Sequence, residues 1–350
     1  MSFKDEIKGA IIGFGHIAAN GHVPAYKKNP RFKICAVFDK CPDREKINQE
    51  LLPGSRFYSC VDDLFKEEQI DFIDIATPPA LHATYILEAL KNKKHVLCEK
   101  PLVLKPEELK QIWQGIKDTG CTVVTVHNWR YSPITQKISH IMASGDIGKA
   151  KEVEYTVIRT KPSVAVGEEK PELNWRLDPS IAGGGILVDH GWHAFYLINE
   201  WVGNTPQKIE CRLENRKFKN ISVEDTATVE VTYFDNTKAR LFFTWAGNKR
   251  QNKIVIKAEN GILSCLDDRI IVENGKKDYQ ITFEEGLSAG SHHPEWYHMV
   301  LNEFFNELTN KNKRTNNFKE AATCFNMLFY SKKAHVEKRP LEMKKWQDIN

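Results

Sequence analysis

The chain has 350 residues, which at roughly 150 residues per domain predicts two domains. Its 50 basic and 46 acidic side chains leave a net charge of +4, too small to argue for a nucleic-acid partner. No apolar run approaches the roughly 18 residues of a membrane span, and glycines interrupt the one early stretch that could resemble a signal peptide. The eight cysteines include no Cys-x-x-Cys pair, so we expect no metal centre, and reduced thiols in a cytoplasmic protein.

The first third of the chain alternates short apolar runs with helical patterns. The apolar runs predict strands at residues 8–12, 32–38, 56–59, 72–76, 96–98 and 122–126. The longest periodic segments between them predict helices at 82–91 and 106–119. Strands buried on both faces and joined by helices are typical of a doubly wound parallel sheet. We therefore predict an α/β domain over residues 1–126.

The pattern changes after the last of these strands. A helix at 134–143 leads into a strand at 152–159, and a long apolar helix follows the three glycines at 183–185. Residues 208–283 show the alternation of antiparallel strands, and two helices close the chain. Three turn signals separate these strands, at Asp235-Asn236, Asn260-Gly261 and Asn274-Gly275. Residues 127–350 are therefore predicted to form an α+β domain with an open, mostly antiparallel sheet.

A glycine-rich turn follows the first predicted strand and begins a helix. The segment Gly13-Phe14-Gly15-His16-Ile17-Ala18 has the spacing that lets backbone N–H groups approach a pyrophosphate at a helix N-terminus. Asp39 ends the second strand, where a carboxylate can accept hydrogen bonds from the ribose hydroxyls of adenosine and would repel a 2′-phosphate. Lys40 and Arg44 lie nearby and weaken that repulsion. The turn predicts a bound dinucleotide, NAD in preference to NADP.

Two segments carry side chains suited to chemistry. Glu99-Lys100-Pro101 follows the fifth strand, at the carboxyl end of a parallel sheet, where ligands bind. In the second domain, Asp189 and His193 are four residues apart on a predicted helix, which places both on one face. The helical period turns His190 away from Asp189. An aspartate one turn from a histidine can orient that histidine as a base.

Together and in order, these motifs resemble those of the Gfo/Idh/MocA oxidoreductases, the family of glucose-fructose oxidoreductase and inositol dehydrogenase. The motifs are Gly-x-Gly-x-x-Ala at 13–18, Thr77-Pro78 with His82, Glu99-Lys100-Pro101, Asn128 with Arg130, Trp175-Arg176, Asp189-x-Gly-x-His193 after the glycines, and Glu224-Asp225. The resemblance spans nearly the whole chain. Trp129-Arg130-Tyr131 departs from the commoner Arg-Phe ending after Asn128, which puts the substrate's identity in doubt.

The resemblance implies a Rossmann domain followed by a substrate domain on a large open sheet, often the dimer surface, and hence a homodimer or homotetramer. It implies that the Lys100–Pro101 bond is often cis, and that Lys100, Asp189 and His193 form the catalytic trio. The residues expected to bind the cofactor are Gly13, Phe14, Gly15, His16, Ile17, Asp39, Thr77, Pro78, His82, Glu99, Lys100 and Asn128. Those expected to bind substrate are Lys100, Arg130, Tyr131, Trp175, Arg176, Asp189 and His193.

Removing a hydride from a secondary alcohol requires a base for the hydroxyl proton. His193 can accept that proton near neutral pH, while a charged Lys100 can donate a hydrogen bond to the developing alkoxide. A desolvated Lys100 could instead be the base, so the sequence leaves this assignment open. The expected enzyme is an NAD(P)-dependent dehydrogenase acting on CH–OH groups.

The substrate class follows from the residues expected near the cleft. These are Tyr131, Arg159, Lys161, Trp175, Arg176 and His293. Aromatic rings can stack on a sugar, and the basic groups can hold a carboxylate or phosphate, so we expect a sugar, sugar derivative or cyclitol. Two alternatives stay open: an NAD-dependent glycosidase that transiently oxidises the sugar, and a non-catalytic NAD(P)-binding regulator.

A histidine-rich segment at 292–298 lacks the spacing of a zinc site. Ser291 is expected to cap the helix that begins there, and His292 or His293 to line the cleft.

Overall fold

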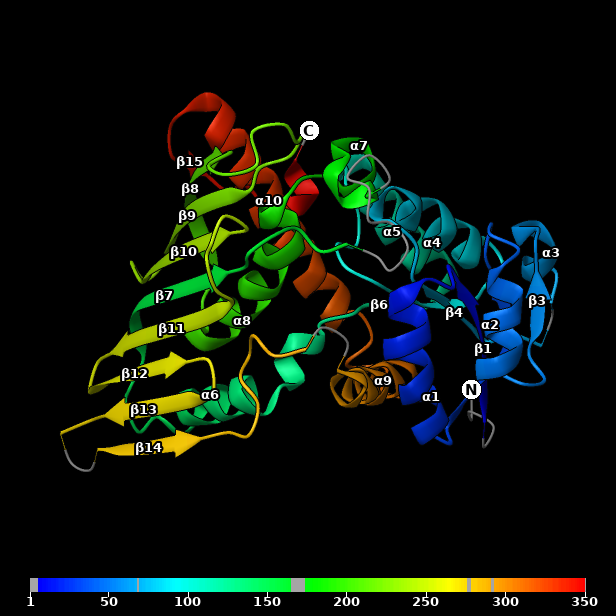
Figure 1. Ribbon diagram of the computed structural model, residues 1–350, viewed down its shortest axis with the longest axis horizontal. Coiled ribbons are helices and arrows are strands. Elements are labelled where there is room, and N and C mark those ends of the chain that lie inside the picture. The colour runs from blue at the N-terminus through cyan, green and yellow to red at the C-terminus, as the bar shows by residue number, and fades with distance from the viewer. Residues whose placement is uncertain (1–5, 68, 165–173, 276–277, 291–292, 350) are drawn as a thin grey trace. The chain divides into compact units, whose positions relative to one another are not determined.

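The computed structural model describes residues 6–67, 69–164, 174–275, 278–290 and 293–349 (Figure 1). Contacts divide the chain into two units: residues 1–128 with 291–322, and residues 129–290 with 323–350. The sequence placed the whole second half in one domain after residue 126, whereas these contacts group 291–322 with the N-terminal unit. Within the described ranges, no helix is both long enough and apolar enough to cross a bilayer.

The first unit is a Rossmann-type fold, as predicted. Its described strands form a six-stranded parallel sheet. In spatial order they are β3 (Arg56–Tyr58), β2 (Phe32–Phe38), β1 (Ile7–Ile12), β4 (Phe72–Ile75), β5 (His95–Cys98) and β6 (Val123–Thr125). The connecting helices are α1 (Val23–Lys28), α2 (Arg44–Leu51), α3 (Val61–Phe65), α4 (His82–Lys91) and α5 (Pro106–Thr119). All four residues of β4 are buried, as expected for a strand covered on both faces.

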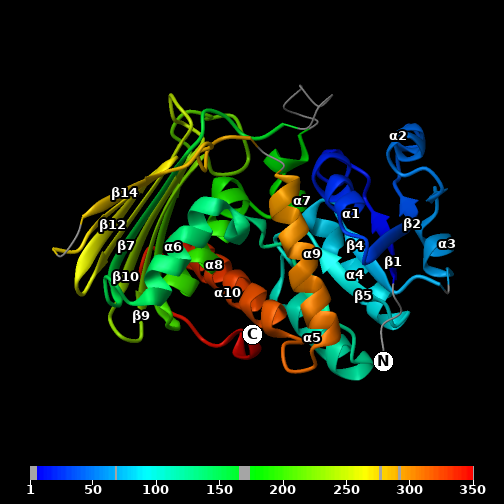
Figure 2. The same cartoon turned by 90° about the horizontal axis from the view of Figure 1, so that it is seen from below.

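Two late helices contribute to this unit. Helix α9 (Pro294–Thr309) packs beside α1, and the first turns of α10 (Asn316–Glu337) lie near α5 (Figure 2). The buried ring of Phe304 lies 5.4 Å from Phe72 and 5.9 Å from Phe32, between ring centroids. The residue before α9 is His293, whose side chain makes no capping hydrogen bond. The predicted cap Ser291, like His292, lies outside the described residues.

The second unit is built on a mixed, mostly antiparallel sheet, which confirms the predicted class. Within the described part of the chain it has nine strands, and only β7 with β10 is a parallel pair. In spatial order they are β14 (Tyr279–Thr282), β13 (Arg269–Glu273), β12 (Gly261–Leu266), β11 (Gln251–Ala258), β7 (Ala150–Ile158), β10 (Lys238–Thr244), β9 (Thr226–Tyr233), β8 (Pro206–Glu214) and β15 (Leu341–Glu342). Helices α6 (Pro133–Ser144), α8 (Trp192–Val202) and the later turns of α10 lie on one face of this sheet (Figure 2).

The helix predicted after the three glycines is not uniform. Residues Leu187–Gly191 form a π-helical turn that continues into α8. A second π-helical turn, Ala18–His22, follows the glycine-rich segment of the first unit and continues into α1. A π-helical turn contains more residues than an α-helical turn and rotates the side chains around it, often at functional sites.

Candidate active site

The glycine-rich segment leaves room for a ligand at one of its two glycines, Gly13 and Gly15. Gly13 has a φ of +91°, and a Cβ there would lie 2.8 Å from Cγ2 of Thr77, so Thr77 packs directly against the turn. A Cβ on Gly15 would have no protein atom within 4 Å. Because this open space lies at the entrance to a helix, the backbone here fits the close approach of a pyrophosphate.

Asp39 is joined to the same turn. Its Oδ2 accepts a hydrogen bond from the Phe14 N–H at 2.7 Å, and its Oδ1 accepts one from the Cys41 N–H at 2.8 Å. The carboxylate therefore helps to shape the glycine-rich turn, a role that the sequence did not predict. Each oxygen keeps a further lone pair with which to accept a ribose hydroxyl.

His82 links two loops at the carboxyl edge of the first sheet. Its ring is buried, with Nδ1 2.8 Å from the Pro101 oxygen and Nε2 2.8 Å from the Thr77 oxygen. Burial lowers the pKa of His82, and the two carbonyls oppose that shift. His82 thus connects the Thr77-Pro78 segment to Lys100-Pro101, whose peptide bond is cis.

Glu99 and Lys100 lie at the end of β5. Oε2 of Glu99 accepts the Lys100 N–H at 3.1 Å, and Oε1 lies 3.1 Å from Nε2 of His22. The Lys100 side chain is half-buried. His22 is a site residue that sequence reasoning missed.

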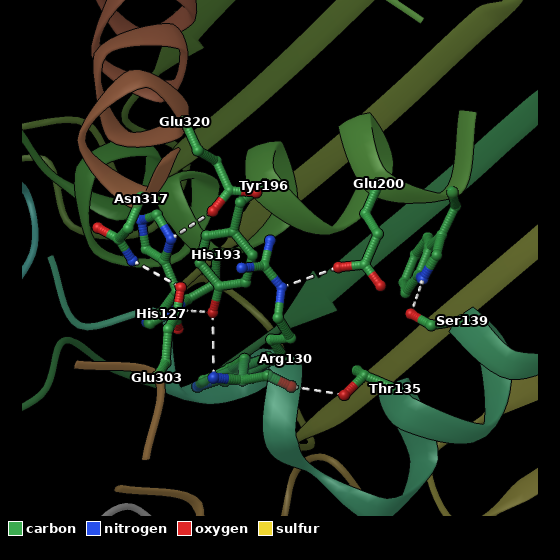
Figure 3. A network of polar contacts seen from close by, with 12 residues as sticks. His127, Arg130, Thr135, Ser139, His193, Tyr196, Glu200, Glu303, Asn317 and Glu320 are labelled. Carbon is green, nitrogen blue, oxygen red and sulfur yellow. Dashed lines mark hydrogen bonds and ion pairs between the residues drawn. The ribbon is translucent and has the colours of Figure 1, made fainter. Parts of the chain in front are cut away.

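In the second unit, the imidazole of His193 is buried among aromatic rings (Figure 3). Its ring stacks on Trp129 with centroids 5.0 Å apart, and its Nδ1 lies 2.9 Å from the Tyr196 hydroxyl. That hydroxyl also accepts the Trp129 N–H at 3.0 Å. Tyr196 therefore contacts both the imidazole of His193 and the backbone of Trp129, and it too was missed from the sequence.

Asp189 lies in the π-helical turn that precedes α8. Its Oδ2 is 3.7 Å from Nε2 of His190, and the His190 ring centroid is 5.9 Å from that of Trp129. The prediction that His190 turns away from Asp189 was therefore wrong, since their polar side-chain atoms approach each other within this turn. That Asp189 orients His193 stays a prediction.

The turn before Asp189 is held by residues distant in the sequence. The backbone oxygen of Glu224 accepts the Ile186 N–H at 3.1 Å, and Oε1 of the Glu224 side chain accepts the Leu187 N–H at 3.1 Å. Lys332 donates to the Gly183 oxygen. A Cβ on Gly185 would overlap the Glu224 oxygen. Only glycine allows this close approach of two backbones.

The expected substrate residues have varied surroundings. Arg130 pairs with Glu200, Nε to Oε2 at 2.8 Å (Figure 3), and lies 5.4 Å over the Tyr196 ring. The Arg176 guanidinium lies 4.3 Å over the half-buried Trp175. The others are placed as follows: Asn128 and Tyr131 lie at the two ends of a 3-10 turn, Arg159 is buried with its guanidinium 6.0 Å from Trp129, Lys161 is exposed, and His293 stacks on Trp296.

No group of three His, Cys, Asp or Glu residues within the described ranges is arranged to hold a metal ion. The first unit therefore carries a nucleotide-type turn and Lys100, and the second unit carries a stacked imidazole with a nearby carboxylate. Such groups can bind a dinucleotide and move a proton.

Comparison with known families agrees with this division into a nucleotide-binding unit and a second domain. Residues 7–127 match the description "Oxidoreductase family, NAD-binding Rossmann fold", and residues 135–264 match the "GFO/IDH/MocA C-terminal domain". Oxidoreductase P35 of Formosa agariphila is 27% identical over 265 residues, which are 75% of this chain and 79% of that protein. Levoglucosan dehydrogenase of Pseudarthrobacter phenanthrenivorans is 32% identical over 142 residues, which are 39% of this chain and 35% of that protein.

Solved structures share the fold at low sequence identity. An Agrobacterium radiobacter oxidoreductase in complex with NAD⁺, L-tartaric acid and magnesium superposes with a TM-score of 0.84 at 18% identity, over 96% of this chain and 98% of that one. A levoglucosan dehydrogenase in complex with NADH and L-sorbose gives 0.83 at 17% identity, over 98% and 100%.

Proposed function

Because the chain belongs to the Gfo/Idh/MocA family of NAD-binding oxidoreductases, we propose that it transfers a hydride between NAD and a secondary hydroxyl of a sugar, sugar derivative or cyclitol. The observation that carries this proposal is the His193 imidazole, held between the Trp129 face and the Tyr196 hydroxyl. A buried, oriented imidazole is suited to take the hydroxyl proton near neutral pH.

The residues of the first unit fit NAD. The backbone around Gly15 would hold the pyrophosphate and Asp39 the ribose hydroxyls. NAD, when bound, supplies the carbon that accepts the hydride. Lys100 would donate a hydrogen bond to the oxygen of the reacting alcohol, His193 would accept the hydroxyl proton, and Asp189 would orient His193.

The substrate class rests on chemistry and on relatives. Trp175 and Trp129 offer aromatic faces for a sugar ring, and Arg176 offers a charge for an acidic derivative. Levoglucosan dehydrogenase and the aldose-aldose oxidoreductase of Caulobacter crescentus, which shares the fold at 16% identity with a TM-score of 0.82, act on sugars by name.

A panel of inositols, aldoses, anhydrosugars, sugar phosphates and nucleotide sugars tests this function through NADH absorbance. We expect turnover within one of these classes. No turnover with any of them would contradict the proposal. Release of nitrophenol from aryl glycosides without net NADH would instead identify the alternative, an NAD-dependent glycosidase.

We also propose that the protein is cytoplasmic and works as a homodimer or homotetramer. Three partly exposed apolar side chains on neighbouring strands of the large sheet support self-association: Ile262, Leu266 and Ile271. Sedimentation equilibrium of the full chain tests the oligomeric state, and a monomer at all concentrations would contradict self-association.

Substituting Gly15 by valine should weaken NAD binding by about 100-fold without unfolding the protein. A Cβ at this position meets no atom within 4 Å outside the neighbouring residues, and the backbone is outside the left-handed region, so we expect the main cost to be the space that the pyrophosphate needs. Calorimetric titration with NADH and the thermal midpoint are the two measurements. Gly13→Val is the contrast: it would clash with Thr77 at a positive φ, so it should lower both affinity and midpoint. Unchanged affinity in Gly15→Val would place the cofactor elsewhere.

A further inference from the structure

His22 is buried between two carboxylates within the first unit. It ends the π-helical turn after the phosphate segment, and its side chain has no exposed surface. Nδ1 lies 3.0 Å from Oδ2 of Asp74 in β4, and Nε2 lies 3.1 Å from Oε1 of Glu99 at the end of β5. Both ring nitrogens therefore face carboxylate oxygens.

This geometry specifies the protonation state of His22. A neutral imidazole has a donor on one nitrogen and a lone pair on the other, so one carboxylate would face a lone pair without a proton between them. The imidazolium donates to both. Glu99 is held as a carboxylate despite its burial, because His22 and Lys100 lower its pKa.

The surroundings reinforce the charge on His22. The Tyr297 ring of α9 stacks on the imidazole with centroids 3.8 Å apart, and its hydroxyl donates to Oδ2 of Asp74 at 3.1 Å. Tyr26 of α1 donates to the same oxygen at 3.0 Å. Burial alone would lower the pKa of His22, but the two carboxylates raise it to about 9.

The Cys98 thiol, next to Glu99, adds no charge. Burial and the nearby carboxylates raise its pKa well above the usual value.

Glu99 connects this cluster to Lys100. One carboxylate oxygen faces His22 while the other accepts the Lys100 backbone N–H, so the position of Glu99 determines where the Lys100 backbone lies. The sequence of charges is negative at Asp74, positive at His22, negative at Glu99 and positive at Lys100. Without the charge on His22, no cation would separate the buried carboxylates of Asp74 and Glu99 near Lys100.

We propose that His22 is a positioning residue which, as a buried imidazolium, holds Glu99 and thereby sets the backbone position and the electrostatic environment of Lys100. The proposal rests on the function proposed for Lys100, but its first two tests need no substrate.

The charge on His22 is tested by NMR of the NADH-bound protein with ¹⁵N-labelled histidine. The His22 signal is assigned by its loss in His22→Gln. We expect both ring nitrogens to carry protons at pH 8, and Glu99→Gln to lower the pH at which the ring titrates. A neutral ring at pH 8 would overturn the proposal, even if the enzyme is an active dehydrogenase.

The pH dependence of stability is a second readout. The pKa of His22 is higher in the folded protein, about 9, than its usual 6.5, so the folded state binds the proton more tightly. The contribution of His22 to stability is therefore complete below about pH 6.5 and is lost as the pH rises through 9. We expect the difference in urea midpoint between wild type and His22→Gln to shrink over that interval. A constant difference would contradict a charged His22.

Kinetics separate positioning from a merely structural role. With the substrate found in the panel, His22→Gln should lower kcat with KM and NADH affinity retained, and should move the pH–kcat profile upward by about one pH unit, because removing a cation favours protonation nearby. His95→Gln is the control, since His95 is a partly buried histidine of the same unit that begins β5, at the end of that strand away from Glu99. It should cost stability and leave the profile in place. An unmoved profile in His22→Gln, or an equal shift in both variants, would refute the proposal.

Discussion

Alanine at Lys100 or at His193 should each lower kcat by about 100-fold or more while NADH binds as before. In the proposed mechanism Lys100 donates to the oxygen on which negative charge develops and His193 accepts the proton of the same hydroxyl, so both interactions would strengthen in the transition state. Losses of this kind appear in kcat rather than in affinity. Steady-state kinetics and NADH fluorescence titration give the two quantities for each variant.

Two exposed residues of the same types are suitable controls. Lys117→Ala on α5 and His140→Ala on α6 should leave kcat unchanged. Added imidazole should restore part of the activity of His193→Ala if His193 is the base, and should leave Lys100→Ala inactive. If a primary amine restored activity to Lys100→Ala with a steeper pH dependence than that of the wild type, and imidazole restored none to His193→Ala, the base would be Lys100. Near wild-type rates in both alanine variants would remove these residues from the mechanism.

The fold of the first unit was largely predictable, because its strands are buried on both faces. Such strands are continuous apolar runs, and the two helices with clear periodicity, α4 and α5, begin and end at the predicted residues. The packing of α9 was not predictable. Its apolar face shows that it covers something, but Phe304 contacts Phe32 and Phe72 more than 230 residues earlier, and no local pattern specifies that surface.

The candidate site was predictable where a motif has a fixed spacing and missed where distant segments meet. Gly15, Lys100 and His193 come from motifs. His22 and Tyr196 act through partners elsewhere in the chain, and each resembles an ordinary core residue. One signal was present: Asp74 interrupts an otherwise apolar strand, and a carboxylate buried in a sheet requires a donor. The identity of that donor needed the structure.

The turn that precedes Asp189 should be the position in the second unit least tolerant of a single added methyl group. Gly185→Ala is expected to lower the free energy of unfolding by about 3 kcal/mol and kcat by more than about 100-fold. A Cβ there would overlap the Glu224 oxygen, with other backbone atoms of Glu224 within 3.0 Å, so no side-chain rotation relieves the clash. Relief requires moving the start of the helix that carries Asp189 and His193, and small displacements of reacting groups are costly.

Gly203→Ala tests whether the effect is local. Gly203 ends α8 with a φ of +66°, and a Cβ there meets no atom within 4 Å, so alanine should cost about 1 kcal/mol from its backbone conformation and leave kcat unchanged. Urea unfolding and kcat are measured for both variants. If Gly185→Ala lost stability but kept its kcat, the clash would be relieved by movement of the Glu224 segment and not by movement of the helix that carries His193. The hydrogen bonds from Ile186 and Leu187 to Glu224 would then not be what positions His193.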